Sequence, residues 1–561
     1  MFLYTRQFHS WAYFVTLVML VMSIPLSRFT MSVFQFTLLG LWIWSDFSFE
    51  ISFRFFRKQG FFNGLYYFLA YMLQLTRTNF IGKFSLFFKN RLAVIVASLF
   101  LLHMVGLIHT SDFSYALKDL RTKLPLLLLP VVFSTMEKIS WEKVRILLLF
   151  YVGSVFIGTL FGLHEYLKQE FTDIRQISLF INPIRFGLNI VFAIFILFGQ
   201  VIFPPKTNKW LALLFALLIV WFVTFLVLIE SAIGLISLFV IFIGLLFVKV
   251  FMIKNKVLRF GIALLLIGLP LSGYLYLSHM VKELTTAPHI DPLTLETHTR
   301  LGNAYLHDTI HFGLEEGKYV GLYLAEAELA EAWNKRSGID FYGRDEANQE
   351  IKYTLIRFLT SKDLRKDAEG LGMLSEKEVR MVEKGIANVH YVTEPSIKTR
   401  MSKILLGYRL YADVNDPNGS SVMQRVEYLK ASYIILRDNF WMGVGTGDLP
   451  GIFKDTYEKM QSPLKMQWRW RSHNQYLSIF IAFGIFGFSW FLFTVFYPFI
   501  SSKKHRGYHY TIFIALILLS MLTEDTIESQ DGVTLFAFFN AFFLFAVMNK
   551  HQESESTEVE A

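Results

Sequence analysis

Long apolar blocks, separated by short charged loops, constrain the fold of this chain more than any other feature. Hydrophobic residues make up 54% and charged residues only 18% of its 561 residues, whereas about 25% of a soluble domain is charged. The blocks approach the ~20 residues that a helix needs to cross a bilayer. Because lipid offers no hydrogen-bond partners, backbone groups inside it must pair within their own helix. We therefore expect an all-α polytopic membrane protein.

The blocks predict about twelve transmembrane helices. The fourth is the weakest, because Pro125 and Pro130 leave a short Leu-rich run between them. The first has no small-residue cleavage site and is expected to be retained as a span. The expected spans cover residues 11–27, 31–47, 92–109, 122–136, 145–164, 184–203, 209–229, 231–249, 258–278, 475–500, 510–524 and 532–549.

Lysine and arginine sort to one side of these spans, which predicts that both termini are cytoplasmic. The net charge of +9 is explained by this sorting, so no nucleic-acid partner is expected. An aromatic run from Phe61 to Leu73 with basic flanks suits a helix lying on the cytoplasmic surface. The cytoplasmic loops hold Arg54, Arg57, Lys58, Arg77, Lys83, Lys89, Arg91, Lys138, Lys143, Arg145, Lys206, Lys209, Lys249, Lys254, Lys256, Arg259, Lys503, Lys504 and Arg506.

The predicted spans and the side on which each loop lies divide the chain into four parts. Residues 1–278 form an N-terminal bundle of about nine spans, and residues 279–474 form one large periplasmic loop domain. Residues 475–549 supply three C-terminal spans, and residues 550–561 form an acidic cytoplasmic tail. The loop domain is expected to be helical, since no strand-rich region stands out in it.

Local patterns predict several helices in the loop domain. Two stretches match the capping-box pattern, in which a Ser side chain and a Glu or Gln three residues later cap each other's backbone. The expected helices are Leu322 to Lys335, Ser375 to about Asn388, Ser421 to about Arg437, and an amphipathic segment from Pro450 to Met460.

Ionisable residues of the spans gather at their outer ends. Arg185, Glu230, Glu524 and Asp525 all lie there, and only His103 lies deep. A proton- or ion-coupled transporter would hold carboxylates near the midplane. The distribution instead favours a site on the outer surface that acts on a membrane-anchored substrate.

Three residues of this outer face are candidates for chemistry. Arg185 either snorkels to the interface or holds a phosphate, which guanidinium binds with two parallel hydrogen bonds. Arg425 lies on a soluble helix that is either a solvated face or part of a site. His473 follows Trp468 and Trp470, where a span begins. It is either an interface-belt histidine or a residue that exchanges protons near neutral pH.

Phosphate-loop and metal motifs are weak or missing in the sequence. Gly443-Val-Gly445-Thr-Gly447 does not follow a strand and lacks the Walker lysine, so a tight turn between helices explains it as well. His307 and His311 lack the zincin glutamate between them. The chain has no cysteine. No metal site and no cofactor is expected.

In their order along the chain, these motifs resemble the O-antigen ligase/polymerase superfamily of bacterial membrane glycosyltransferases. The similarity covers mainly residues 421–490, from the Arg425 helix through the glycine turn to Ser472-His473-Asn474. The layout is also similar: about twelve spans, a large periplasmic loop before the last three, and Arg185 at the head of a middle span. Two features depart from the family. Residues 300–410 form a larger block than the family needs, and Glu230-Ser231-Ala232 stands where many members have Ser-Arg.

The resemblance implies an all-α fold similar to the GT-C membrane glycosyltransferases, in the bacterial inner membrane with its site on the periplasmic face. The donor would be a glycan on undecaprenyl diphosphate, and the acceptor lipid A-core or another glycan. His473, Arg185 and Arg425 would be catalytic in a metal-independent, inverting transfer. Contacts with the substrate would involve Arg469, Arg471, Asn474, Gly445 and Gly447.

Three other functions stay open from the sequence. A polymerase that joins lipid-linked repeats shares the whole signature with the ligase, which we favour. A transporter of lipid-linked glycan would need polar residues through the midplane. A sensor or scaffold that binds a partner through its loop would tolerate substitution of Arg185, Arg425 and His473.

Overall fold

The computed structural model describes residues 2–45, 47, 49–168, 174–202, 209–393, 396–502 and 507–548. The predicted acidic tail and the basic residues Lys206, Lys503, Lys504 and Arg506 lie outside these ranges. The chain divides into two compact units. The first unit contains residues 1–160, 180–223 and 424–561, and the second contains residues 161–179 and 224–423. The division falls inside the predicted loop domain, since residues 424–474 belong with the C-terminal helices.

Each of the twelve expected spans contains a helix. Within the described residues, six of these helices (α7, α8, α9, α10, α11 and α20) are long and apolar enough to cross a membrane. The α-helical, multi-span character is thus confirmed, while the count of twelve and the side of the termini stay predictions. The helices are α1 (Phe2–Ser23), α2 (Arg28–Ile43), α4 (Arg91–Val105), α6 (Pro125–Thr135), α7 (Trp141–Lys168), α8 (Pro183–Ile202), α9 (Lys209–Leu228), α10 (Ala232–Met252), α11 (Lys256–Thr285), α20 (Gln475–Ser501), α21 (Tyr508–Met521) and α22 (Gln530–Ala541), which the π-helical turn η5 (Phe542–Ala546) extends.

The core of the first unit is built around α8 and α22. Helix α21 packs on α8, and α6 packs on both α4 and α22. Aromatic rings fill the centre: Phe538 and Phe542 of α22 and η5 meet Phe133 of α6 edge-on. Nearly every side chain of α8 and α22 is buried, polar ones included, because other helices surround both. Their buried first turns therefore bring polar residues into the interior at one end of the bundle.

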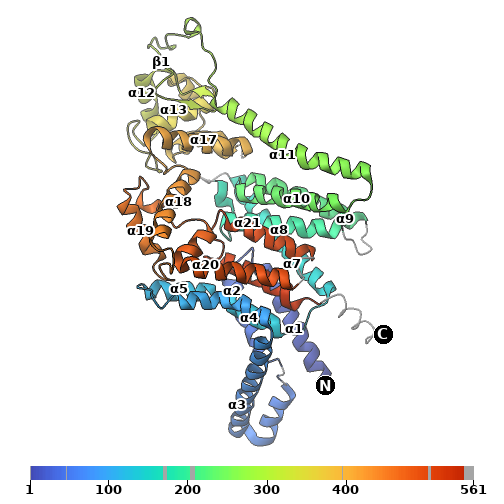
Figure 1. Ribbon diagram of the computed structural model, residues 1–561. Helices are drawn as coiled ribbons and strands as arrows, with labels where there is room; N and C mark the ends of the chain where they lie inside the picture. Colours follow the sequence, from blue (N-terminus) through green and yellow to red (C-terminus); the bar gives the residue numbers. More distant parts are fainter. Residues whose placement is uncertain are drawn as a thin grey trace. The chain divides into compact units, whose positions relative to one another are not determined.

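Helix α3 (Phe49–Lys89) runs away from this bundle (Figure 1). It breaks at Gly60 and meets α4 at a bend of 100°. Phe61, Phe62 and Tyr66 are exposed on it. The helix is longer than the predicted segment from Phe61 to Leu73, but the bend and the exposed aromatic residues support a helix in the plane of the membrane surface.

The second unit contains α10, α11 and a small helical core around Trp333 and Phe358. Two hairpins precede it, in which β1 pairs with β4 and β2 with β3, all antiparallel. The elements are η1 (Ile174–Ile177), η2 (Pro292–Thr294), β1 (Leu306–Asp308), β2 (Leu314–Glu315), β3 (Lys318–Tyr319), β4 (Gly321–Leu324), α12 (Glu326–Arg336), α13 (Ile351–Ser361), α14 (Ala368–Gly372), α15 (Glu376–Glu383), α16 (His390–Thr393) and α17 (Ile397–Val414).

These hairpins correct one sequence prediction. The helix expected from Leu322 begins only at Glu326, since Leu324 pairs with Leu306 in β4. Helix propensity in a short segment is a weak preference that tertiary pairing overrides.

The two expected capping boxes differ in outcome. Ser375 and Glu378 cap each other at the start of α15, as predicted, but the helix ends at Glu383 rather than near Asn388. At α18 (Ser421–Asp438) the cap lies one residue earlier than predicted, because the Ser420 hydroxyl accepts from the Met423 amide at 3.4 Å. The amphipathic segment forms α19 (Leu449–Lys459), as expected.

Helix α20 is broken at Gly484, and the glycine turn fills the break. Gly484 has φ 61° and ψ −168°, a region that only glycine adopts without strain. The amide of Ile485 donates to Phe440 at 2.9 Å, and that of Val444 donates to Ile481 at 2.9 Å. The turn and the helix are therefore joined backbone to backbone.

Gly484→Ala is expected to destabilise the protein by at least about 1–3 kcal/mol, the cost of a strained backbone position. The new Cβ would also lie only 2.1 Å from the Trp441 carbonyl oxygen, so the turn must shift. The midpoint of thermal unfolding in detergent measures the effect. Gly153→Ala on α7 is the matched control, since its Cβ meets nothing within 4 Å. Equal unfolding midpoints for both variants would contradict this account of the break.

Candidate active site

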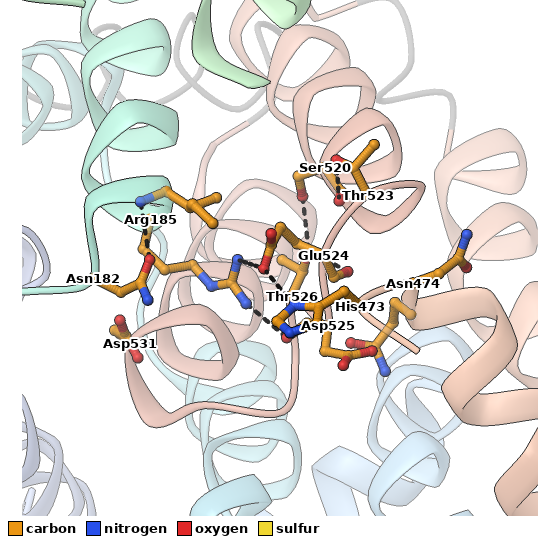
Figure 2. A network of polar contacts seen from close by, with 12 residues as sticks. Asn182, Arg185, His473, Asn474, Ser520, Thr523, Glu524, Asp525, Thr526 and Asp531 are labelled. Atoms are coloured by element: carbon orange, nitrogen blue, oxygen red, sulfur yellow. Dashed lines mark hydrogen bonds and ion pairs between the residues drawn. The ribbon is translucent and has the colours of Figure 1, made fainter. Parts of the chain in front are cut away.

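Glu524 is the centre of a polar cluster in the first unit. It lies in the loop between α21 and α22, and only 6% of its side chain is exposed. Arg185, Arg425 and His473 approach it from three different elements, and Figure 2 shows Arg185 and His473 on either side of the carboxylate. The structure therefore gathers all three residues that the sequence predicts to be catalytic.

Arg185 enters the cluster from the first turn of α8. Its Nη2 donates to the Asp525 carbonyl oxygen at 2.7 Å, and its Nη1 lies 3.7 Å from Glu524 Oε2. The side chain is only 7% exposed, yet Nε and Nη1 make no hydrogen bond with the described part of the chain. A buried donor without a partner is costly. These two nitrogens are closed to solvent, so an additional acceptor such as a phosphate oxygen would reach them only after a local rearrangement.

Arg425 reaches the same carboxylate from α18. Its Nη2 forms an ion pair with Glu524 Oε1, while 30% of its side chain stays exposed. The residue is therefore not on a purely solvated face: one end of the guanidinium pairs with a buried acid, and the rest is open to solvent.

His473 lies immediately before α20 in an unusual conformation. Its φ is 47°, which is uncommon for a residue other than glycine and often marks functional sites. The imidazole stacks on Tyr428, with ring centroids 5.3 Å apart. Nδ1 lies 3.5 Å from Glu524 Oε2, and Asn474 caps α20 by accepting from the Leu477 amide at 3.1 Å. Backbone, stacking and carboxylate together fix the direction of the ring.

The surrounding charges keep Glu524 ionised. Burial raises the pKa of a carboxyl group by disfavouring its charged form. The contact with His473 and the positive charges of Arg185 and Arg425 act in the opposite direction and prevail, so the pKa of Glu524 lies below its ordinary value. The cluster thus holds a buried carboxylate between two arginines and a histidine.

A second buried network supports the loop from the other side. Glu528 pairs with Lys123 of α5 (Phe113–Lys123) at 2.9 Å and with Arg471 at 3.2 Å. Gln475, in the first turn of α20, donates to Glu528 at 2.9 Å and accepts from the Ile527 amide at 2.8 Å. Arg471 therefore belongs to the support of the loop, one step from Glu524.

Glu528→Gln is expected to flatten the acid dependence of stability. Burial alone would raise the pKa of Glu528, but Lys123 and Arg471 outweigh it and lower the pKa to about 2. Because the folded-state pKa is depressed, the stability it contributes is present above about pH 4.5 and is lost as the pH falls toward 2. Thermal unfolding in detergent at pH 7 and pH 3 measures this, with the exposed Glu331→Gln as control. If the unfolding midpoint falls by the same amount between pH 7 and pH 3 in wild type and in Glu528→Gln, the ion pairs of Glu528 do not cause the acid dependence.

Gly445 and Gly447 lie in the packed turn next to α4 and α5. A Cβ on Gly447 would lie 2.2 Å from the Asp112 carbonyl oxygen, and one on Gly445 would lie 2.7 Å from Thr110 Oγ1. The Asp448 carboxylate accepts from the Ser111 amide at 2.8 Å. The close approach of backbones explains why glycine is needed here, and a role in substrate contact stays a prediction.

The two remaining predicted substrate contacts, Arg469 and Asn474, lie on the segment that leads into α20. Arg469 follows the short turn η3 (Met466–Trp468) and donates to the Leu464 carbonyl oxygen at 3.0 Å. Asn474 Nδ2 donates to the Leu522 carbonyl oxygen at 2.8 Å, which ties the start of α20 to the loop that holds Glu524. Their contact with substrate stays a prediction.

Sequence reasoning placed Glu524 at the outer face but did not include it in the site, and it missed Tyr428 and Glu528. A usable signal was present. Glu524, Asp525 and Glu528 form an acidic loop between two apolar helices, and the predicted site was basic. Three positive or protonatable groups gathered in a partly buried place need a counter-charge.

Part of the sequence that forms this site also matches a known protein family. The family model described as O-antigen ligase matches residues 386–492. The matched range includes Arg425, the glycine turn and His473, while Arg185 and Glu524 lie outside it. A search of curated proteins found no match.

Proposed function

Since the O-antigen ligase family model matches residues 386–492, we propose that this chain is a member of that superfamily and transfers a glycan from undecaprenyl diphosphate to an acceptor in the outer leaflet. The favoured acceptor is lipid A-core, which makes the protein a ligase of the inner membrane with its site on the periplasmic face. The observation that carries the proposal is the junction at Glu524, where residues from three distant parts of the sequence meet.

His473 acts as the general base in this proposal. Because Nδ1 faces Glu524, Nε2 is the nitrogen that takes the proton from the acceptor hydroxyl. The acceptor oxygen forms the new bond to the anomeric carbon, and the bond from that carbon to the diphosphate breaks with its electrons on the diphosphate. A single displacement of this kind inverts the anomeric configuration. Glu524 stabilises the imidazolium that forms, as an acid partner does for a catalytic histidine.

Arg185 and Arg425 bind the diphosphate leaving group. Negative charge grows on its oxygens as the glycosidic bond breaks, and preorganised cationic donors stabilise such charge. Arg185 offers two buried nitrogens without a hydrogen-bond partner among the described residues, and the Arg425 side chain is 30% exposed. In this metal-independent mechanism, the arginines supply the charge that a divalent cation provides in other enzymes.

The other predicted contacts take supporting positions. Asn474, Gly445 and Gly447 fix the start of α20 and hence the place of His473. Arg471 holds the loop through Glu528, and Arg469 lies at the edge of the same segment. We assign these residues to positioning and to the approach of the donor head group.

Arg185→Gln is expected to lower the transfer rate by about 100-fold, the usual effect of removing one preorganised donor. Arg185→Lys should give an intermediate rate, because it keeps the charge but loses the planar fork. The rate of glycan transfer by purified protein measures both. Arg121→Gln on the exposed face of α5 is the control for loss of one positive charge. A wild-type rate for Arg185→Gln would remove Arg185 from the mechanism.

Complementation separates ligase from polymerase. Expression of the chain in a strain that lacks its O-antigen ligase is expected to restore long glycan on lipid A-core, and His473→Ala at equal expression is expected not to. If the chain instead restores polymerisation of lipid-linked repeats in a polymerase-deficient strain, polymerase replaces ligase. If it changes neither product, the proposed transfer is wrong.

A further inference from the structure

A cavity of about 670 Å³ lies in the first unit at a distance from the Glu524 cluster. Its walls come from α1, the end of α2, α3, and the segment that joins α6 to α7. Met548, just after η5, closes one side. None of the residues placed in the glycan-transfer site lines it.

The cavity and the Glu524 cluster lie at opposite ends of α22 and η5. The Glu524 loop directly precedes Gln530, and Met548 follows Ala546 by two residues. The 12 residues of α22 and the 5 of η5 span about 25 Å at 1.5 Å per residue. The hydrocarbon core of a bilayer is ~30 Å thick. A protein with one site at the outer membrane surface therefore has the cavity at the inner one.

Basic side chains dominate the polar part of the wall. Lys83, Lys138 and Lys143 line it together with a single acid, Glu137. Lys138 and Lys143 are exposed residues that line the cavity. Lys83 is held deeper by hydrogen bonds to the Trp42 carbonyl oxygen and to Ser45 Oγ at 2.7 Å. The net charge of this wall favours an anion.

Tyr13 supplies an independent sign of a missing ligand. Its side chain is buried and lines the cavity. Its hydroxyl makes no hydrogen bond with the described part of the chain. Buried hydroxyl groups in folded proteins almost always have a partner. The hydroxyl is closed to solvent in this conformation, so an acceptor oxygen on a molecule within the cavity would supply the partner once the Tyr13 side chain turns toward it.

The position of α3 indicates which kind of anion reaches the cavity. Lys83 belongs to this helix, whose exposed aromatic residues and 100° bend suit the membrane surface. A ligand that enters beside α3 comes from the level of the lipid head groups. Basic pockets between helices on the inner side of a membrane are suited to anionic lipid head groups.

We propose that this cavity binds the phosphate group of an anionic phospholipid, with Lys138 and Lys143 as the ionic contacts and Tyr13 as a hydrogen-bond donor. The site is separate from the proposed site of glycan transfer, and its placement on the inner side of the membrane rests on the proposed outer position of that site. The same phosphate chemistry would suit a soluble phosphate compound, so the experiment distinguishes the two sources.

Binding is measured on the full-length protein in mixed detergent micelles, by native mass spectrometry and by the midpoint of thermal unfolding. The probes are phosphatidylglycerol, phosphatidylcholine and inorganic phosphate. Phosphatidylglycerol should bind and stabilise wild type, and the other two should not. The double variant Lys138→Gln/Lys143→Gln should bind phosphatidylglycerol about 30-fold more weakly, from about one lysine's surface attraction each. Tyr13→Phe should weaken binding by about 5-fold, for one hydrogen bond.

The control is Lys58→Gln/Lys89→Gln, which removes the same charge from exposed positions of α3 that do not line the cavity. It should bind phosphatidylglycerol as wild type does. The proposal is overturned if both double variants lose binding equally, because the attraction is then general. It is overturned equally if inorganic phosphate stabilises the protein as strongly as phosphatidylglycerol, because the source is then soluble.

Discussion

Replacing His473 with asparagine is expected to lower the rate of glycan transfer by about 100- to 10,000-fold, the usual contribution of a general base. Asparagine is the sharper substitution because His473 has φ 47°, and asparagine tolerates the left-handed region better than alanine does. The ring would be lost while the backbone before α20 keeps its shape. Transfer by purified protein at saturating donor and acceptor measures the rate.

The control is His311→Asn, which changes an exposed histidine of the second unit. It should transfer at the wild-type rate. The unfolding midpoint of His473→Asn should stay close to that of wild type, which separates loss of chemistry from loss of fold. A folded His473→Asn protein with full activity would show that His473 is only an interface residue.

Glu524→Gln is expected to lower the transfer rate by about 10,000-fold, the size of the effect when the acid partner of a catalytic histidine is lost. The substitution keeps the size of the side chain and removes its charge. His473 then loses the group that fixes Nδ1, and Arg185 and Arg425 lose their shared counter-charge. Glu524→Asp, with the charge drawn back by one methylene, should recover part of the rate.

The expected effect of Glu524→Gln includes stability, because two arginines would face a neutral amide. Removing one member of a buried ion pair costs about 3–5 kcal/mol, and the exposure of Arg425 reduces that cost. Glu331→Gln, an exposed acid that pairs with Lys335, is the control. If Glu524→Gln were less stable but fully active, Glu524 would be a structural residue alone.

The fold class was predictable because a membrane leaves few choices. Apolar length alone placed a helix in all twelve expected ranges. Details that depend on contacts were not predictable. Strand β4 (Gly321–Leu324) forms because Leu306 pairs with Leu324, and Ser420 caps α18 although Ser421 opens the matching pattern. The local sequence indicates neither the pairing of Leu306 with Leu324 nor the choice of Ser420 as the cap.

The basic residues of the site were predictable from the sequence, but the acid at its centre, Glu524, was not. Arg185, Arg425 and His473 carry recognisable positions relative to the spans, and the structure brings them to one carboxylate. Glu524 is separated from them by 339, 99 and 51 residues, and only packing of α8, α18 and α20 around the loop shows the connection. Charge balance would have pointed to the acidic loop.

The most direct test of the account is a double-mutant cycle between His473 and Glu524, read as the rate of undecaprenyl diphosphate release that accompanies glycan transfer. If Glu524 acts mainly through His473, the rate loss of the double variant His473→Asn/Glu524→Gln is far smaller than the product of the two single losses, because a group that works through another adds little once that other is gone. If the two rate losses multiply instead, the residues act independently and Glu524 is not the partner of His473.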